Sequence, residues 1–238
     1  MDDVDLEQLA DAYQFRMMSQ SVAAHAGVSC EGCHGVALDV GGGLGGHALV
    51  MRSNGLAPIV VDASPTMCAS AAAAGVASVV ARSQDLPVRD GVAGLVYFHL
   101  SIHYGDWRRA LDEAARALTS TGRIEIWTFD PAAMRRAELA RWFPSAAVID
   151  AVRFPALDDL SSWLEESGFE VAVSHHPETV ERTAGAWVTA VRNRFVSTLQ
   201  LIDDDELERG VAAFIDHHGD SEAPYRYTLD HVRISAIR

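Results

Sequence analysis

The chain has 238 residues, of which 49% are hydrophobic and 22% are charged, and its formal net charge at pH 7 is -14. This is ordinary globular usage, and no apolar run approaches the roughly 18 residues that a membrane helix requires. All 19 basic residues are arginines, which excludes every function that needs a lysine, such as a Schiff base, a pyridoxal phosphate anchor or a phosphate-loop lysine.

The charge and the cysteines indicate the partners and the compartment. An acidic protein repels nucleic-acid backbones and anionic membranes, so we expect a small-molecule substrate, no nucleic acid and no membrane. Residues 1–13 contain neither a basic segment nor an apolar stretch that would direct export, so a soluble, cytoplasmic protein is expected, as a monomer or homodimer. Cys30, Cys33 and Cys68 are too few for a disulfide framework and are expected to be reduced thiols.

The first predicted element is a helix over residues 5–24. Apolar residues recur there at helical spacing, namely Leu6, Leu9, Tyr13 and Met17. This spacing predicts an amphipathic helix that lies on the core, so we expect residues 1–30 to form a helical lid.

Residues 36–129 alternate between short apolar runs and stretches with a helical pattern. The apolar runs are VALDV, PIVVDA, ASVVAR, LVYFHL and RIEIWTF. They are typical of parallel strands buried on both faces, and the stretches between them are typical of crossover helices. The helix that begins at Trp107 is expected to end at Leu118, before the stop signal Ser120-Thr121-Gly122. The pattern predicts five strands of a parallel sheet.

Beyond Phe129 the pattern changes to helices and two isolated strands. Helices are predicted over residues 131–143, 157–167, 183–201 and 204–217, and strands over 169–174 and 225–238. Four residues of the later helices are expected either on a solvent-exposed or interface face or in the region that determines substrate selectivity: Arg182, Trp187, Arg192 and Arg194. No linker divides the chain, so we expect one α/β domain over residues 1–238, with a cofactor-binding core at 31–130 and substrate-side helices and last strands at 131–238.

Two motifs with incompatible functions lie next to each other before and after the first strand. Cys30-Glu31-Gly32-Cys33-His34 has the C-x-x-C-H spacing of covalent haem attachment. The expected cytoplasmic location opposes haem attachment, and zinc needs about four ligands, for which no second cysteine or histidine pair has the right spacing. We therefore expect no metal and interpret this segment as a short loop.

The second motif is a glycine-rich turn after the strand VALDV. Gly41, Gly43 and Gly46 fit G-x-G-x-x-G, while Asp39 with Gly41, Gly43 and Gly45 fits D-x-G-x-G-x-G, so the glycines alone do not separate two kinds of cofactor. Asp39 does separate them. A carboxylate at this point repels the pyrophosphate of a dinucleotide but suits a ligand with an ammonium group, such as the methionine part of S-adenosylmethionine.

Two further acidic residues follow the next strands of the predicted sheet. Asp62 ends the second strand, where a carboxylate can accept from both hydroxyls of a ribose. Asp85 follows the third strand, where it can accept from an adenine amino group. Because the carboxyl ends of parallel strands meet at one edge, we expect Asp39, Asp62 and Asp85 to line one crevice.

Four stretches, in this order, resemble class I S-adenosylmethionine-dependent methyltransferases of the ubiquinone/menaquinone-methyltransferase-like group. They are LDVGGGLGGHA, VVDASPTMCASA, ARSQDLPVRDGVAGLVYFHLSIHY and RRALDEAARALTSTGRIEIWTF. The resemblance covers roughly residues 36–129, and Gly122 stands in a turn where the family usually has Pro-Gly-Gly. It implies a Rossmann-like, doubly wound, mostly parallel seven-stranded sheet whose last strand is antiparallel, with an N-terminal helical lid and a C-terminal helical insertion.

The resemblance also implies roles for individual residues, with S-adenosylmethionine as cofactor and S-adenosylhomocysteine as product. Gly41, Gly43 and Gly45 would surround the methionine part above Asp39. The other implied cofactor-binding residues are Asp62, Ala63, Asp85, Leu86 and His99.

Methyl transfer mostly needs positioning and a base for the proton of the acceptor. The best candidate base is His103, which follows the fourth strand, and Tyr104, Tyr13 and Arg16 are candidates for substrate contacts. We expect transfer to oxygen, nitrogen or carbon of a small molecule, and the arginine-only, alanine-rich usage is typical of GC-rich bacteria that modify secondary metabolites or quinones in their biosynthesis. The alternatives are a non-catalytic cofactor-binding protein of the same fold, serving as a sensor or structural partner, and a nicotinamide-dependent oxidoreductase.

Overall fold

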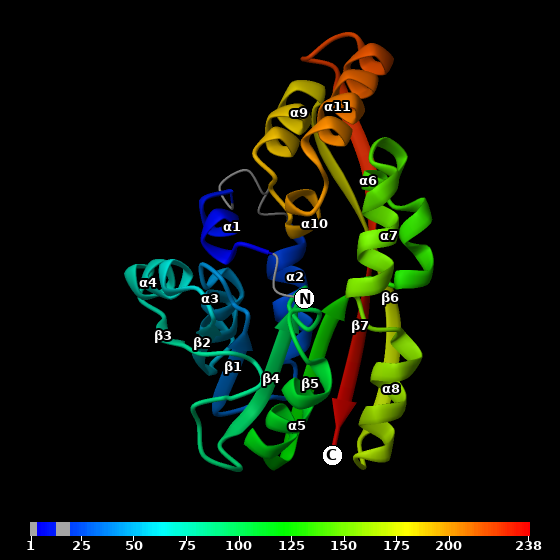
Figure 1. Cartoon of the computed structure of the whole chain (residues 1–238). Helices are drawn as coiled ribbons and strands as arrows, with labels where there is room; N and C mark the ends of the chain where they lie inside the picture. The colour runs from blue at the N-terminus through cyan, green and yellow to red at the C-terminus, as the bar shows by residue number, and fades with distance from the viewer. Residues whose placement is uncertain (1–3, 13–19) are drawn as a thin grey trace. The chain divides into compact units, whose positions relative to one another are not determined.

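The computed structural model describes residues 4–12 and 20–238 (Figure 1). In these ranges the N-terminal part forms helix α1 (Leu6–Ala12) and helix α2 (Gln20–Cys30). Helix α1 lies within the helix that the sequence predicts over residues 5–24, and helix α2 begins within it and continues beyond residue 24. Tyr13 and Arg16, two of the predicted substrate contacts, lie outside the described residues, as does Met17.

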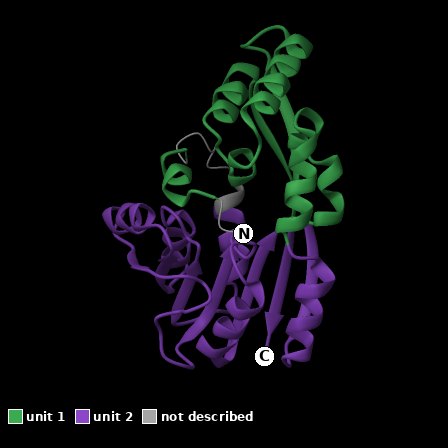
Figure 2. Cartoon of the chain, viewed as in Figure 1, with its two compact units in different colours: residues 1–19, 129–154, 176–231 green, residues 20–128, 155–175, 232–238 purple. Residues whose placement is uncertain are grey.

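The chain divides into two compact units (Figure 2). Unit 1 comprises residues 1–19, 129–154 and 176–231, and unit 2 comprises residues 20–128, 155–175 and 232–238. Two long strands, β6 (Glu170–Thr183) and β7 (Pro224–Ile237), contribute residues to both. The single domain over residues 1–238, with its lid and substrate side, stays a prediction.

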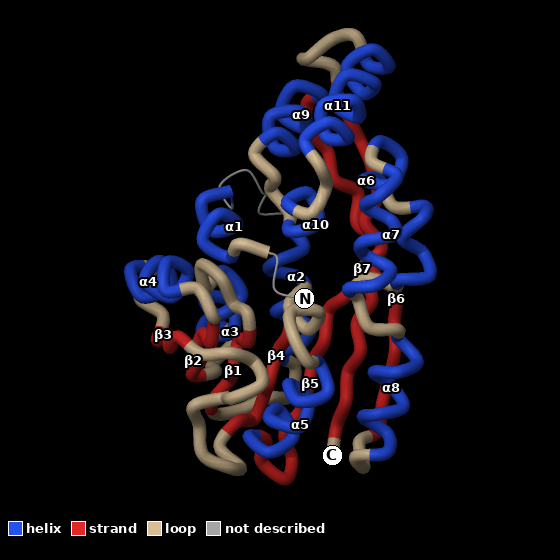
Figure 3. The backbone as a smooth tube through the Cα atoms, in the orientation of Figure 1, coloured by secondary structure: helices blue, strands red, loops and turns tan. Residues whose placement is uncertain are grey.

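Seven strands form one sheet in the order β3-β2-β1-β4-β5-β7-β6 (Figure 3). The strands that come before β6 are β1 (Val36–Val40), β2 (Ala57–Asp62), β3 (Ala77–Val80), β4 (Ala93–His99) and β5 (Leu118–Thr128). These five pair in parallel, and β7 pairs antiparallel with β5. The predicted fold is therefore confirmed, including the antiparallel last strand. The strand predicted over residues 169–174 is longer than expected, because β6 continues to Thr183.

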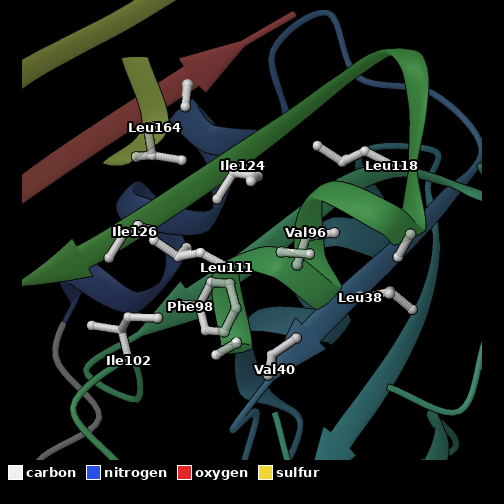
Figure 4. Packing of buried hydrophobic residues seen from close by; sticks show 14 of the residues in the cluster. Leu38, Val40, Val96, Phe98, Ile102, Leu111, Leu118, Ile124, Ile126 and Leu164 are labelled. Atoms are coloured by element: carbon white, nitrogen blue, oxygen red, sulfur yellow. The ribbon is translucent and has the colours of Figure 1, made fainter. Parts of the chain in front are cut away.

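The core of unit 2 explains why the strands read as continuous apolar runs. Along β4, Val96 and Phe98 pack into one cluster of buried side chains, while Leu95 and Tyr97 pack into another. Figure 4 shows the first cluster, in which Leu111 of α5 and Leu164 of α8 pack with residues of β1, β4 and β5. Both faces of β4 are thus buried, as in a doubly wound sheet.

Besides α2, four helices of unit 2 pack around these strands. They are α3 (Gly46–Ser53), α4 (Pro65–Ala73), α5 (Trp107–Ala117) and α8 (Leu157–Glu166). Asp106 caps the start of helix α5, where its side chain accepts from the backbone amides of Arg108 and Arg109. The helix ends one residue before the predicted end. The predicted stop at residues 120–122 lies inside β5. There residues 119–122 bulge out opposite the single residue Gly94, since Ala93 pairs with Leu118 and Leu95 with Arg123.

Unit 1 departs from the predicted helices at three points. The helix predicted over 131–143 is a 3-10 helix, η2 (Pro131–Arg136), followed by α6 (Glu138–Trp142), and the two are separated by the extended backbone of Ala137. Helix α7 (Pro144–Arg153) was not predicted, because Pro144 looks like a stop but occupies its first turn. The helix predicted over 183–201 divides into α9 (Ala184–Arg192) and α10 (Ser197–Gln200).

The break after α9 has a local cause. The side-chain amide of Asn193 donates to the carbonyl of Thr189, and Arg194 has a positive φ of 50°, which ends helical geometry. Helix α11 (Asp204–His218) matches its prediction within one residue.

The core of unit 1 is aromatic. Trp187 of α9 is fully buried and stacks on Phe214 of α11, with ring centroids 3.9 Å apart. The expectation of a solvated face is wrong for Trp187 and Arg182, because both residues are buried, and the alternative that this region determines substrate selectivity stays a prediction. No helix among the described residues is both long enough and apolar enough to cross a bilayer.

Candidate functional site

The glycine turn joins β1 to α3 at the carboxyl end of the sheet. Gly41, Gly43 and Gly45 have φ values of 71°, 54° and 81°, the left-handed region that favours glycine. A Cβ on Gly41 would lie 2.4 Å from Cβ of Ser101, the second residue after β4. The hydroxyl of Ser101 in turn donates to the carbonyl of Val40 over 2.6 Å. The turn thus passes against the end of β4 with no room for a side chain.

Asp39 lies beneath this turn with its carboxylate only 1% exposed. A Cβ on Gly42 would come within 2.7 Å of its Cγ, so the backbone of the turn lies directly on the carboxylate. Neither carboxylate oxygen makes a well-formed hydrogen bond to the described residues. Burial, and secondly the negative charge of Asp62, raise the pKa of Asp39 to about 7, against a smaller opposing effect of the Ala48 backbone amide.

Asp62 ties the end of β2 to the turn. Its Oδ2 accepts from the backbone amide of Gly43 and its Oδ1 accepts from that of Ser64, both over 2.9 Å. The next residue, Ala63, is exposed.

Asp85 and Leu86 lie in the segment between β3 and β4. Asp85 is exposed, whereas Leu86 is buried and its backbone amide donates to the carboxylate of Glu113 on α5 over 2.9 Å. Glu113 is paired with Arg116, whose guanidinium also donates to the carbonyl of Leu86. Helix α5 therefore fixes the backbone of this loop and leaves the side chain of Asp85 in solvent.

At the end of β4, His99 is surrounded by aromatic rings. Nε2 of His99 lies 3.1 Å from Nδ1 of His25 on α2, which stacks on Trp127 with centroids 3.7 Å apart. His47, in the first turn of α3, lies with its ring centroid 4.2 Å from that of His99. Burial lowers the pKa of His47 to about 4, so this ring is neutral at pH 7. Sequence reasoning had not placed His25 here, because it meets His99 only across 74 residues of chain.

The segment after β4 turns sharply and buries His103. Leu100 has a φ of 50°, unusual for a branched residue, and its amide donates to the carbonyl of Trp127. The ring of His103 is 4% exposed and lies 4.2 Å, between centroids, from that of Tyr104. The carbonyl of Tyr104 accepts from the side chain of Gln84, which connects this segment to the loop after β3.

The family of the chain follows from the same region. Residues 38–126, which contain the glycine turn, the three carboxylates, His99 and His103, match the family model described as a methyltransferase domain. Residues 38–126 therefore form a methyltransferase domain, and the sheet that contains them has the strand order typical of class I, S-adenosylmethionine-dependent methyltransferases. The match decides against a nicotinamide-dependent oxidoreductase.

Solved methyltransferases share the fold at low sequence identity. A putative methyltransferase from an antibiotic biosynthesis pathway of Anabaena variabilis has a TM-score of 0.74 and 21% identity, over 93% of this chain and 98% of that one. The geranyl diphosphate C-methyltransferase of Streptomyces coelicolor has a TM-score of 0.57 and 16% identity, over 91% of this chain and 80% of that one. A possible histamine N-methyltransferase of Thermotoga maritima has a TM-score of 0.57 and 18% identity, over 98% of this chain and 94% of that one. A search of curated proteins finds no match.

The cysteines next to the glycine turn are buried. Cys30 ends α2, rather than lying in the predicted loop, and Cys33 follows it; both are buried. Burial, and secondly the neighbouring Cys33, raise the pKa of Cys30 to about 11. A thiol with this pKa is protonated at pH 7 and is a weak nucleophile.

Proposed function

We propose that this methyltransferase transfers a methyl group from S-adenosylmethionine to oxygen, nitrogen or carbon of a small-molecule acceptor. The observation that carries the proposal is the buried Asp39 carboxylate beneath a glycine turn that Asp62 anchors. Ionised Asp39 has no cationic partner among the described residues, so a cation above the turn would stabilise it, whereas a pyrophosphate would destabilise it. The residues present therefore fit a ligand with an ammonium group.

The cofactor-binding roles follow from this arrangement. Gly41, Gly43 and Gly45 would surround the methionine part, and Asp62 would accept from the ribose hydroxyls beside Ala63. Asp85 would accept from the adenine amino group, with the apolar side chain of Leu86 against the ring. His99 would border the site from the end of β4, held by its hydrogen bond to His25.

Calorimetry of purified, cofactor-stripped protein tests the donor. We expect micromolar dissociation constants for S-adenosylmethionine and S-adenosylhomocysteine and no binding of NAD. Cofactor binding without turnover across many acceptors would favour the alternative of a non-catalytic sensor or structural protein. Binding of NAD alone would contradict the proposal.

Asp62→Asn is expected to weaken S-adenosylhomocysteine binding about 100-fold, since two hydrogen bonds to a charged group contribute roughly 3 kcal/mol together. Titration measures the loss, and Asp158→Asn, an exposed carboxylate on α8, is the matched control.

Deoxy analogues separate two explanations of that loss, because Asp62 also holds the Gly43 amide. If Asp62 binds the ribose, an analogue without the 2′ and 3′ hydroxyls binds the wild type more weakly than S-adenosylhomocysteine does. The Asp62→Asn variant then binds the analogue and S-adenosylhomocysteine with equal affinity. If Asp62 only holds the turn, the analogue loses the same factor in both proteins, and the ribose role is wrong.

The bound cofactor supplies an electrophilic methyl group on a sulfonium, and the chain has to orient the acceptor and remove its proton. His103 would hold that proton on a ring nitrogen, with Tyr104 beside it as a substrate contact. His103→Gln is expected to lower kcat by about 10²-fold or more and to remove the acidic limb of the pH profile, with S-adenosylhomocysteine affinity unchanged. His34→Gln, an exposed histidine, is the control. An unchanged kcat for an acceptor that must lose a proton would contradict a base role.

The acceptor class is proposed as a secondary metabolite or a quinone, within the ubiquinone/menaquinone-methyltransferase-like group. The description of the Anabaena protein supports a biosynthetic role, and the Streptomyces structure holds S-adenosylhomocysteine, the proposed product. The acceptors named for the Streptomyces and Thermotoga proteins differ in the methylated atom, so the proposal keeps oxygen, nitrogen and carbon. A cytoplasmic monomer or homodimer is proposed with it.

A further inference from the structure

Arg182 occupies an inward position near the end of β6, within unit 1. Burial alternates along this part of the strand, where Val180 and Arg182 are 7% and 9% exposed and Glu181 between them is exposed. Glu181 accepts from Arg226 of β7 on the outer face, over 3.0 Å. The inward position next to Val180 is one at which a half-buried strand normally carries an apolar residue. An arginine there needs an explanation.

Among the described residues, the guanidinium of Arg182 is near two aromatic rings and has no ion pair with a carboxylate. Its Cζ lies 5.3 Å from the ring centroid of Phe195 and 6.0 Å from that of Tyr227. Its Nε is buried without a hydrogen-bond partner, and no ion pair joins it to a carboxylate in residues 4–12 and 20–238.

Arg153, the other buried arginine among the described residues of unit 1, has polar partners. It donates to the hydroxyl of Ser197 over 3.0 Å and lies 3.7 Å from the carboxylate of Asp150. The described residues of unit 1 therefore supply polar partners to Arg153 but no hydrogen-bond acceptor to Nε of Arg182.

Cation–π contacts leave the edge of the guanidinium unsatisfied. A guanidinium is always charged and carries five N–H donors in its plane, whereas an aromatic ring interacts with its charge from the face. A buried charge without a hydrogen-bonded counter-ion is unfavourable. The 9% exposure of the side chain shows that it is not sealed from solvent.

The acidic groups nearby do not neutralise Arg182. Glu138 and Glu178 are near Tyr227, which is a neighbour of Arg182. Burial raises the pKa of Tyr227, the charge of Arg182 opposes that rise, and the two carboxylates add to it. Glu138 instead accepts from the indole of Trp142, and Glu178 lies 3.8 Å from His231.

We propose that Arg182 is the centre of an oxyanion-binding site in unit 1, which takes the carboxylate or phosphate group of a small molecule. The planar fork of a guanidinium matches both groups through two parallel hydrogen bonds. Phe195 and Tyr227 contact the charge and leave the N–H groups for the ligand. The site uses none of the residues proposed for methyl transfer, so it stands or falls independently of that function.

Thermal unfolding with simple anions tests the site. Wild type, Arg182→Met and Arg226→Met are unfolded in sodium phosphate, sodium propionate and sodium chloride at equal ionic strength. We expect phosphate or propionate to raise the Tm of wild type and Arg226→Met over the chloride value, and Arg182→Met to abolish the rise. In chloride, Arg182→Met should be no less stable than wild type, because it removes an unpaired buried charge. A rise with phosphate alone or propionate alone identifies the group that the site takes.

Two results would overturn the proposal. One is no rise in wild type with either anion, and the other is an equal rise in Arg182→Met. If Arg182→Met does not fold, Arg182→Lys keeps the charge but removes the fork, and titration should then show anion binding weakened about tenfold or more. Equal affinity in Arg182→Lys would likewise exclude a guanidinium-specific site.

Discussion

Arg233→Met is expected to lower the free energy of unfolding by about 3–5 kcal/mol, because it removes the arginine that is hydrogen-bonded to the buried carboxylate of Glu125 and leaves only Arg123 at 3.5 Å. Glu125 of β5 is fully buried, and Arg233 of β7 binds it through two hydrogen bonds, Nε to Oε2 over 2.7 Å and Nη2 to Oε1 over 2.8 Å. Ser235, directly opposite Glu125 in the antiparallel pairing, donates to Oε1 over 2.8 Å. This network joins the last strand to the parallel part of the sheet.

Urea unfolding followed by circular dichroism measures the loss, and two variants define its origin. Arg192→Met breaks an exposed pair with Glu208 and should change stability by less than about 1 kcal/mol. Glu125→Leu combined with Arg233→Met removes both charges and should recover most of the stability lost in Arg233→Met. Equal, small losses in Arg233→Met and Arg192→Met would mean that Arg123, 3.5 Å from Glu125, neutralises the carboxylate by itself.

The strands of unit 2 could be predicted because buried strands have a recognisable sequence pattern. A strand that is covered on both faces needs apolar residues at every position, and runs such as LVYFHL have them. The exceptions inside these runs are informative: Asp39 and Glu125 are the two buried carboxylates of the parallel strands, and each has a specific reason to be there. One lies beneath the glycine turn and the other binds Arg233.

The helices of unit 1 were predicted less well, because their ends depend on single residues with two meanings. Pro144 can stop a helix or begin one, and here it begins α7. Asn193 and Arg194 have ordinary helix propensities, so nothing local predicts that Arg194 adopts a positive φ.

Side-chain partnerships across the chain could not be predicted at all. The pairing of His25 with His99 requires α2 to lie against the end of β4, and the spacing of the two histidines carries no signal of it. Arg182 was expected on a solvated face because charge usually indicates exposure. The alternation of β6, which buries Arg182, was hidden because that strand was predicted to end at residue 174.

Asp39→Asn is expected to stabilise the cofactor-free protein at alkaline pH, by up to about 4 kcal/mol at pH 8. The pKa of Asp39 is raised to about 7 in the folded chain, so between about pH 4 and pH 7 the folded state keeps a proton that the unfolded state has released. Stability from this group is therefore fully present below pH 4 and is lost as the pH rises through 7. Asparagine does not ionise, so the difference between variant and wild type should grow over this range and stay constant above it.

Urea unfolding of both proteins at intervals from pH 4.5 to pH 8.5 measures that difference. The comparison cancels His47, whose lowered pKa acts in the opposite direction, since it removes stability as the pH falls below about 6.5. A difference that does not change with pH would mean that Asp39 is ionised throughout, and that the Ala48 amide outweighs burial.

The same substitution should have the opposite effect on cofactor binding, if the proposed function is right. A ligand with an ammonium group favours ionised Asp39, so binding near pH 7 should release a proton, and the calorimetric enthalpy in wild type should vary with the ionisation enthalpy of the buffer. Asp39→Asn should abolish that variation and weaken binding. A variant that binds as tightly as wild type, with the same buffer dependence, would show that the buried carboxylate does not respond to the ligand. The stability result would then stand alone, because it depends only on burial of Asp39 beneath the turn.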